Sequence, residues 1–262
     1  MSGLISLTTD FGTIDPFVGI MKAVILGISP KTRIVDLSHE IEAQNILQAA
    51  RVLSASAQWF PKGSVHLAVV DPGVGSNRRA LAVKSDGHFF VAPDNGILST
   101  VLNEKSKIYA LDKPKYFMKN VSGTFHGRDV FAPVSAWIAK GTPLPMMGTQ
   151  IYDPILLDIP KIKTDKGQLT GEVIAIDRFG NLATNILQND IVKNFPPSSE
   201  LIVRIGGKKI AGPFSCYNEA RPNTGACLIN STSVLEIFCN RGNAEKKLKL
   251  KVGTTVTLTE KH

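Results

Sequence analysis

The sequence has few cysteines, no long apolar run and no cluster of metal-binding residues. Its three cysteines, among 262 residues, are far apart and none has a histidine beside it, so neither a disulfide framework nor a zinc site is indicated. No stretch approaches the ~20 apolar residues of a membrane helix, and the first residues lack the basic start and apolar core of a signal peptide. We therefore expect a cytoplasmic protein that binds no membrane and needs no metal or other cofactor.

The chain is basic, but its basic residues do not form a nucleic-acid-binding pattern. The formal net charge is +8, which makes nucleic acid a partner to consider. The densest run, four lysines within residues 246–251, alternates with apolar residues, as on the solvated face of a strand or short helix. No aromatic residues are interleaved with these lysines to stack on bases. We expect no nucleic acid partner.

The first half of the chain alternates strand-like and helix-like segments. This rhythm predicts an α/β fold with a largely parallel sheet. Expected strands are Leu4–Thr8, Arg33–Leu37, Val65–Val70, Leu81–Val83 and Phe89–Ala92. Expected helices are a segment opened by Asp15-Pro16 and running to about Ile28, then Ala43–Phe60, Gly96–Leu102 and Asp129–Ala139, with Asp15 and Asp129 as caps.

The second half of the chain begins with a proline-rich segment and continues with short strand-like segments. Four prolines between residues 141 and 166 break regular structure, and short β-like segments separated by Gly-rich turns follow. We expect an N-terminal α/β domain over residues 1–145, a linker over 146–165, and a smaller antiparallel β-barrel-like domain over 166–262.

Three polar loops follow predicted strands directly, where ligands of parallel sheets collect. They are Thr9–Asp15, Asp71–Arg79 and Pro93–Gly96. Asp10 can accept hydrogen bonds from two ribose hydroxyls, or cap a turn in its own loop. Asp71–Arg79 has a carboxylate at one end and two guanidiniums at the other, which can orient a water molecule or form an internal salt bridge. Its glycine spacing matches neither a phosphate-binding loop nor a dinucleotide fingerprint.

Two further segments carry candidate chemistry. His126 lies in a polar loop before a predicted helix and is a better catalytic candidate than His66, which is inside an apolar strand, or His262, the last residue of the sequence. We interpret His39 as supporting a turn. The segment Asp177–Asn181 offers a carboxylate, an aromatic face and an amide. That set suits a ligand with a cationic amine and a flat ring, and equally a hairpin turn with a packed Phe.

Taken in order, six segments resemble one family closely. They are Thr8–Gly12, Asp36–Ile41, Val69–Gly75, Ala92–Gly96, Thr124–Asp129 and Asp177–Asn181. The chain resembles the S-adenosylmethionine (SAM) hydroxide adenosyltransferases, relatives of the SAM-dependent chlorinases and fluorinases. The resemblance runs from Thr8 to about Gly242. It implies a SAM hydrolase that releases adenosine and methionine, and a homotrimer with SAM between neighbouring subunits.

The resemblance also implies roles for individual residues. The water-activating set would be Asp71, Arg78 and His126, with Asp71 and His126 holding the water and receiving its proton while Arg78 stabilises developing hydroxide. Substrate-binding residues would be Asp10 for the ribose hydroxyls, Asn95 and Phe125 for the reaction pocket, Asp177 for the methionine ammonium, Phe179 and Asn181 for adenine, Ser231 for the methionine carboxylate, and the backbone near Arg241 for the adenine edge.

Asp71 favours water over halide as the attacking group. The halogenases carry uncharged or aromatic residues at that position, and a carboxylate beside the attack line would repel a halide ion. Two alternatives stay open from the sequence, namely a SAM- or adenosine-binding regulator without turnover and a halide-using transferase. Because Arg79 stands next to Arg78, the guanidinium of the set is also left open.

Overall fold

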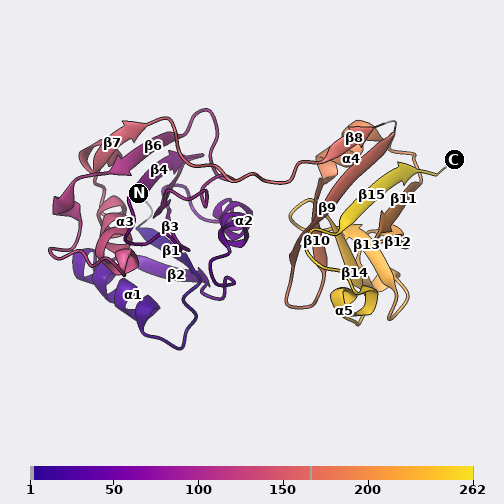
Figure 1. Cartoon of the computed structure of the whole chain (residues 1–262), viewed down its shortest axis with the longest axis horizontal. Coiled ribbons are helices and arrows are strands. Elements are labelled where there is room, and N and C mark those ends of the chain that lie inside the picture. Colours follow the sequence, from indigo (N-terminus) through magenta and orange to yellow (C-terminus); the bar gives the residue numbers. More distant parts are fainter. Residues whose placement is uncertain (1–2, 166, 262) are drawn as a thin grey trace. The chain divides into compact units, whose positions relative to one another are not determined.

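The computed structural model describes residues 3–165 and 167–261 and divides into two compact units (Figure 1). The first unit ends at Asp158 and the second begins at Ile159, within the segment that we expected to join two domains. Each unit has its own sheet and its own hydrophobic core.

The first unit is built on a seven-stranded mixed sheet with the order β2-β1-β3-β5-β4-β6-β7. The first three pairings are parallel and the remaining three are antiparallel. The expected α/β domain is therefore confirmed, with an antiparallel half added to its parallel half. The strands are β1 (Leu4–Thr9), β2 (Arg33–Ser38), β3 (Val65–Val69), β4 (Ala80–Ser85), β5 (His88–Pro93), β6 (Lys107–Leu111) and β7 (Gly148–Ile151).

Helices cover both faces of this sheet. On one face, α1 and α3 pack with the apolar side chains of the central strands into one core cluster, and α2 packs on the other face into a second cluster. Every residue of β3 is buried, as expected for a strand covered on both sides. The helices are α1 (Phe17–Ile28), α2 (Ile46–Ala57), the 3₁₀ turns η1 (Pro114–Tyr116) and η3 (Leu144–Met146), the π-helical turn η2 (Gly127–Phe131) and α3 (Ala132–Ala139).

Several helix predictions were wrong in detail. Residues 97–101 form turns closed by hydrogen bonds to the third residue before, rather than a helix. Helix α1 begins at Phe17 with Pro16 at its cap, so Asp15 lies one residue too far out to cap it. The helix expected from Asp129 begins earlier as η2, and the Asp129 carboxylate instead accepts hydrogen bonds from Arg128 and from the Ser122 amide. Helix α2 is shorter than expected and is capped by Asn45.

The second unit is a closed barrel of seven strands. The order is β10-β14-β13-β12-β11-β15-β9, and the pairing of β9 with β10 closes it, while β8 extends β9 on the outside. The expected barrel is confirmed; one of its pairings, β12 with β13, is parallel. The elements are β8 (Lys163–Asp165), β9 (Gln168–Ile176), β10 (Leu182–Leu187), α4 (Gln188–Asn194), β11 (Leu201–Ile205), β12 (Lys208–Phe214), η4 (Tyr217–Glu219), β13 (Gly225–Ile229), β14 (Val234–Cys239), α5 (Ala244–Leu248) and β15 (Thr255–Glu260).

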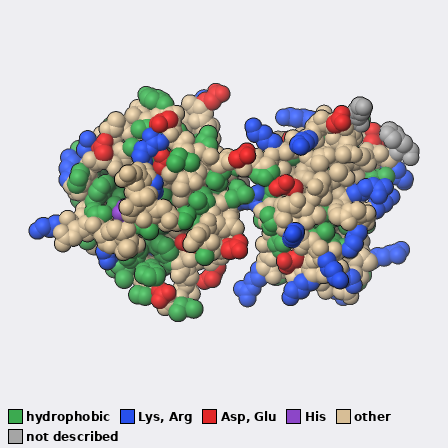
Figure 2. All heavy atoms as spheres, viewed as in Figure 1, with side chains coloured by type: hydrophobic (Ala, Val, Ile, Leu, Met, Phe, Trp, Pro, Cys, Tyr) green, Lys and Arg blue, Asp and Glu red, His purple; other side chains and the backbone are tan. Residues whose placement is uncertain are grey.

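The surfaces of the two units differ in character. Figure 2 shows hydrophobic side chains on the part of the first unit that carries α1, where Ile14, Phe17 and Ile20 are exposed. Lysine and arginine side chains are spread over the second unit. Among the described residues, no helix has the length and apolar character to span a membrane, and no group of three or more His, Cys, Asp or Glu side chains is placed to hold a metal ion.

Truncating a side chain at the centre of the parallel strands should destabilise the first unit. Leu67 of β3 is fully buried, so Leu67→Ala should lower the free energy of unfolding by about 2–5 kcal/mol through lost burial and a residual cavity. The same truncation at Leu26 of α1, which is 41% exposed, should cost about 0.5 kcal/mol. Urea titrations of both variants measure the difference, and equal costs would contradict the assigned core.

Candidate active site

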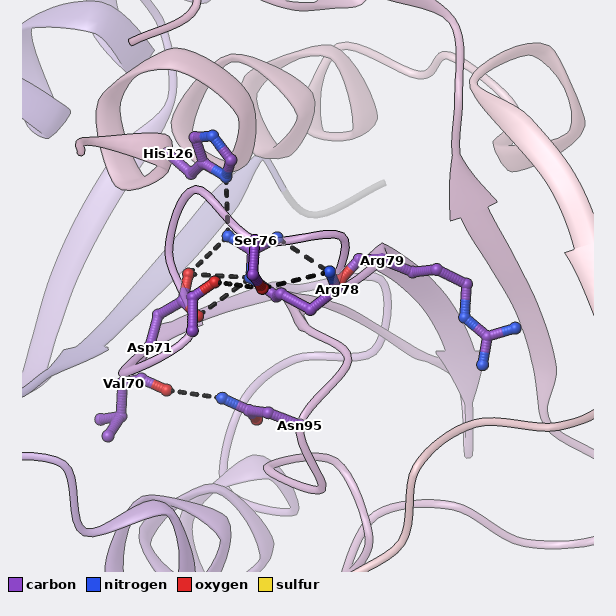
Figure 3. A network of polar contacts seen from close by, with 8 residues as sticks. Val70, Asp71, Ser76, Arg78, Arg79, Asn95 and His126 are labelled. Carbon is purple, nitrogen blue, oxygen red and sulfur yellow. Dashed lines mark hydrogen bonds and ion pairs between the residues drawn. The ribbon is translucent and has the colours of Figure 1, made fainter. Parts of the chain in front are cut away.

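Three side chains from two loops converge beyond the carboxyl end of β3. The β3–β4 loop supplies Asp71 and Arg78, and the residue just before η2 is His126. Nε of Arg78 donates to both Asp71 carboxylate oxygens at 2.9 and 3.0 Å, and Nη2 donates to Oδ2. The same Nη2 lies 2.7 Å from Nδ1 of His126 (Figure 3). Arg78 thus bridges a carboxylate and an imidazole that are 55 residues apart in the chain.

The Asp71–Arg78 pair is almost completely removed from solvent. The Arg78 and Asp71 side chains are 9% and 5% exposed, and the guanidinium lies 5.1 Å from the ring centre of Phe131. A buried charge pair is stable only when its geometry is good and its remaining donors are used. Here two donating nitrogens face the carboxylate and one of them also faces the imidazole, which meets that requirement.

The contact with Arg78 determines the tautomer of His126, and burial together with the Arg78 charge determines its protonation. A guanidinium has only N–H donors, so Nδ1 of His126 must accept, and its ring is neutral with the proton on Nε2. Burial lowers the pKa of His126 below its usual value, and the positive charge of Arg78 lowers it further, although Asp71 and Asp129 act in the opposite direction. A neutral imidazole at neutral pH is the result.

The neighbouring arginine has a different partner. Nε of Arg79 donates to Asp94 at 2.7 Å, and Nη1 donates to Asp153 at 2.8 Å. Figure 3 shows its guanidinium pointing away from His126. Arg79 therefore ties the segment around Asp153 to the end of β5, and Arg78 is the guanidinium of the cluster.

The loop packing that forms the cluster requires glycine at position 75. Gly75 has φ +79°, and a Cβ at this position would lie 2.3 Å from the carbonyl oxygen of Gly123. The β3–β4 loop can approach the segment before His126 only because no side chain intervenes.

Asp10 and Asn95 follow β1 and β5, the strands on either side of β3, and they differ in how fully their polar atoms are hydrogen-bonded. One oxygen of the Asp10 carboxylate accepts from the Gln44 amide at 2.9 Å, and within the described part of the chain the other has no partner. Both ends of the Asn95 amide are used inside the protein, because Nδ2 donates to the Val70 carbonyl at 2.8 Å and Oδ1 accepts from the Ile97 amide. Asn95 therefore holds the backbone just before Asp71.

Phe125 belongs to an aromatic cluster beside His126. Phe11, Phe17 and Phe125 meet edge to face, with ring centres 5.3 to 6.0 Å apart. The guanidinium of Arg128 lies 5.2 Å from the Phe125 ring centre. These residues line a cavity of about 420 Å³ together with Ser122 and Thr124. The cavity offers an apolar surface with hydroxyls at its edge.

The second unit has a cavity of its own, formed by the segment 177–181 and the loop after β14. It measures about 470 Å³ and is lined by Asp177, Phe179, Asn181, Tyr217, Cys239, Asn240, Arg241 and Gly242. Asp177 accepts from the backbone amides of Phe179 and Asn181 and from the Asn181 side chain. Those bonds hold a tight turn, which leaves the Phe179 ring 74% exposed. Ser231 is not among the lining residues, so its role stays a prediction.

Sequence reasoning missed Tyr217 in this cavity. The crossover between the parallel strands β12 and β13 carries it, and its hydroxyl donates to Glu236 at 2.8 Å. Burial, followed by the contact with Glu236, raises the pKa of Tyr217 to about 12. Glu236 also accepts from Asn230 and is itself buried. An acidic residue within the apolar run of β14 needs such partners, and this was the signal in the sequence.

The arrangement around Arg78 predicts how His126 titrates. Replacing Arg78 by Gln removes a positive charge that disfavours the imidazolium, so the pKa of His126 should rise toward its ordinary value. Arg79→Gln is the matched control and should leave it unchanged, because Arg79 contacts Asp94 and Asp153 instead. NMR titration of the His126 ring in both variants measures this, and equal shifts would contradict the geometry.

Comparison with known proteins assigns the chain to a family. Residues 5–148 match the SAM hydroxide adenosyltransferase N-terminal domain, and residues 171–257 match the C-terminal domain of the same family. The (R)-S-adenosyl-L-methionine hydrolase of Methanocaldococcus jannaschii is 38% identical over 94% of this chain and 92% of its own length, and the protein of that name from Thermus thermophilus is 34% identical over 95% and 97%. A fluorinase from Actinoplanes is 27% identical over 98% and 97%. The crystal structure of an uncharacterized conserved protein from Thermotoga maritima, at 34% identity, superposes with a TM-score of 0.90 over 97% of this chain and 99% of that one. The chain belongs to the SAM hydroxide adenosyltransferase family.

Proposed function

We propose that this protein hydrolyses SAM to adenosine and L-methionine by attack of water on the ribose C5′ atom. The observation that carries the proposal is the buried cluster of Asp71, Arg78 and His126, which presents a carboxylate and an imidazole held by one guanidinium. The hydrolases that this chain matches along almost their whole length support it.

The step of the reaction that needs catalysis is deprotonation of the attacking water. Methionine leaves from a sulfonium, so the C5′–S electron pair returns to sulfur as a neutral thioether and needs no acid. The new C5′–O bond forms as water loses a proton, and bulk water has a pKa of about 15.7. A positioned base is therefore the main contribution required of the protein, typically worth ~10²–10⁴-fold in rate.

The hydrogen bonds divide the work among the three residues. Nδ1 of His126 faces Arg78, so the Nε2–H of the same ring is left to hold the oxygen of the water. Asp71 is the proton acceptor, because a carboxylate oxygen has lone pairs beyond those that face Arg78. Arg78 keeps the carboxylate in place and supplies the positive charge that stabilises developing hydroxide in a buried site.

Substrate binding is proposed from residues of both units. The unpartnered oxygen of Asp10 would accept from a ribose hydroxyl, and Phe125 would pack on the sugar. In the barrel, Phe179 and Asn181 would face adenine, with the backbone at Arg241 contacting its edge. Asp177 would bind the methionine ammonium and Ser231 the carboxylate.

The thiols are consistent with a cytoplasmic location. Cys216, Cys227 and Cys239 are all free, as is usual in a reducing compartment. We propose that the reaction takes place in the cytoplasm.

Isotopic labelling of the product tests both the reaction and the role of Asp71. In ¹⁸O-labelled water with SAM, the released adenosine should carry the label at its 5′ oxygen, which mass spectrometry detects. Asp71→Asn should cut turnover by ~10²–10⁴-fold through loss of the base while calorimetry still shows SAM binding.

Two controls make this result specific. Asp10→Asn should chiefly weaken SAM binding, because its carboxylate would contact the ribose rather than the water. Added chloride should yield no chlorinated nucleoside. Unlabelled adenosine, or full turnover by the Asp71 variant, would rule out the proposed mechanism.

We also propose that the enzyme is a homotrimer in which each site takes residues from two subunits. The water-activating cluster belongs to the unit that ends at Asp158, and the cavity around Phe179 belongs to the unit that begins at Ile159. A ring of heterologous contacts would join one half-site to the other half-site of the neighbouring copy. The exposed apolar side chains of Ile14, Phe17 and Ile20 supply a surface for such contacts.

Mixed oligomers test this shared site. Asp71→Asn and Phe179→Ala proteins, each weakly active alone at low SAM, should regain activity when unfolded and refolded together in equal amounts. Random assembly of a cyclic trimer makes about one quarter of the shared sites free of both substitutions, so about that fraction of wild-type activity should return. Sedimentation analysis should show a trimer. No gain on mixing would contradict shared sites.

A further inference from the structure

A second cavity lies in the first unit, beside the amino-terminal end of β5. It measures about 480 Å³, and its lining includes Ser54, Gln58, Lys62, His88, Phe90 and Thr100. His88 begins β5, whereas Asn95 follows the other end of the same strand. The cavity is therefore at the opposite edge of the sheet from Asp71, and the proposed hydrolysis does not use it.

His88 lines this cavity, and one of its ring nitrogens has an unused hydrogen-bonding capacity. The residue is 2% exposed, and Nε2 has no hydrogen-bond partner among the residues that the structure describes. Its other ring nitrogen, Nδ1, lies 3.4 Å from Nε2 of His66, and Nδ1 of His66 lies 2.7 Å from the Ser6 hydroxyl. A buried polar atom without a hydrogen-bond partner lowers the stability of the folded protein, so a ligand that bonds to Nε2 of His88 would be stabilising.

The chain of contacts from Ser6 determines which way the protons point. In the described part of the protein, the Ser6 hydroxyl contacts only Nδ1 of His66, so its proton is satisfied only if it donates there. His66 must then carry its proton on Nε2 and donate to Nδ1 of His88. This leaves His88 with an N–H at Nε2, a donor that needs an acceptor.

Lys62 and Asp86 both line the cavity beside His88, and the Lys62 ammonium supplies N–H donors for an anionic acceptor, whereas the Asp86 carboxylate opposes one. Nζ of Lys62 donates to the Asp86 carbonyl at 2.8 Å, which leaves two of its three N–H groups for a ligand. The Asp86 carboxylate accepts from the Asn103 side chain. The hydroxyl protons of Ser54 and Thr100 are donated to backbone carbonyls, so these two hydroxyls have no proton left to donate to a ligand.

We propose that this cavity binds a small oxyanion, a carboxylate or a phosphate, whose oxygens accept hydrogen bonds from Nε2 of His88 and from the Lys62 ammonium. Phe90, Ala57 and Val101 give the cavity an apolar wall, which would accommodate the carbon portion of such a ligand. The inference does not depend on SAM hydrolysis, because none of these residues belongs to the proposed active site.

Binding should also change how His88 titrates. Burial lowers the pKa of His88, and Lys62 lowers it further while Asp86 opposes this. His66, the remaining titratable neighbour, is held neutral by burial with a pKa of about 4. A bound anion would favour the imidazolium, so the pKa of His88 should rise when the site is occupied.

Histidine NMR of the full chain tests the site without an activity assay. Sodium acetate and sodium phosphate are titrated separately at constant ionic strength, with sodium chloride as the balancing salt. At least one should shift the His88 Nε2–H resonance saturably and raise its pKa. Acetate alone acting identifies a carboxylate site, phosphate alone a phosphate site, and both a general oxyanion site.

Two lysine variants separate the site from general charge effects. Lys62→Met should weaken the saturable binding by about tenfold or more, as expected for loss of a charged hydrogen bond. Lys119→Met removes an exposed lysine that does not line the cavity and should leave binding unchanged. If neither anion gives saturable shifts, or both variants respond alike, His88 contacts water alone and the proposal is overturned.

Discussion

The candidate active site depends on one guanidinium. Arg78 donates to the Asp71 carboxylate and to the His126 ring at the same time, and its contact with His126 joins their two loops (Figure 3). Because the pair is nearly inaccessible to solvent, neither charge is stable without the other. Burial lowers the pKa of His126 and the contact with Arg78 lowers it further, and the same contact fixes the tautomer of the ring.

The fold places this interaction where the backbone permits it. Parallel strands deliver the loops after β1, β3 and β5 to one edge of the sheet, and Gly75 allows the β3–β4 loop to reach the segment before His126. In the barrel, the parallel pairing of β12 with β13 requires the chain to cross over between these strands, and that crossover carries Tyr217 to the cavity around Phe179. The topology of each unit therefore explains how residues far apart in the chain come to share one site.

His126 and the His66–His88 pair, all in the first unit, lie in different surroundings. His126 contacts the charged Arg78 guanidinium, and its ring is neutral with a defined tautomer. Among the described residues, the side-chain hydrogen bonds of His66 and His88 are with each other and with Ser6, so their protons are ordered by a chain of neutral contacts that ends at an unused N–H. The first arrangement suits activation of a water molecule. The second suits recognition of an acceptor that comes from outside the protein.

The sequence by itself determined the α/β unit, the barrel and the family, because strand-like runs, glycine turns and ordered polar segments are local properties of the chain. It could not choose between Arg78 and Arg79, which have the same chemistry one residue apart. Packing decided this, since one side chain turns to Asp71 and the other to Asp94. Likewise Asp129 and Asp15 look like helix caps in the sequence, and the true helix starts removed both roles. The unused nitrogen of His88 follows from contacts among residues up to 82 positions apart, which only the tertiary structure brings together.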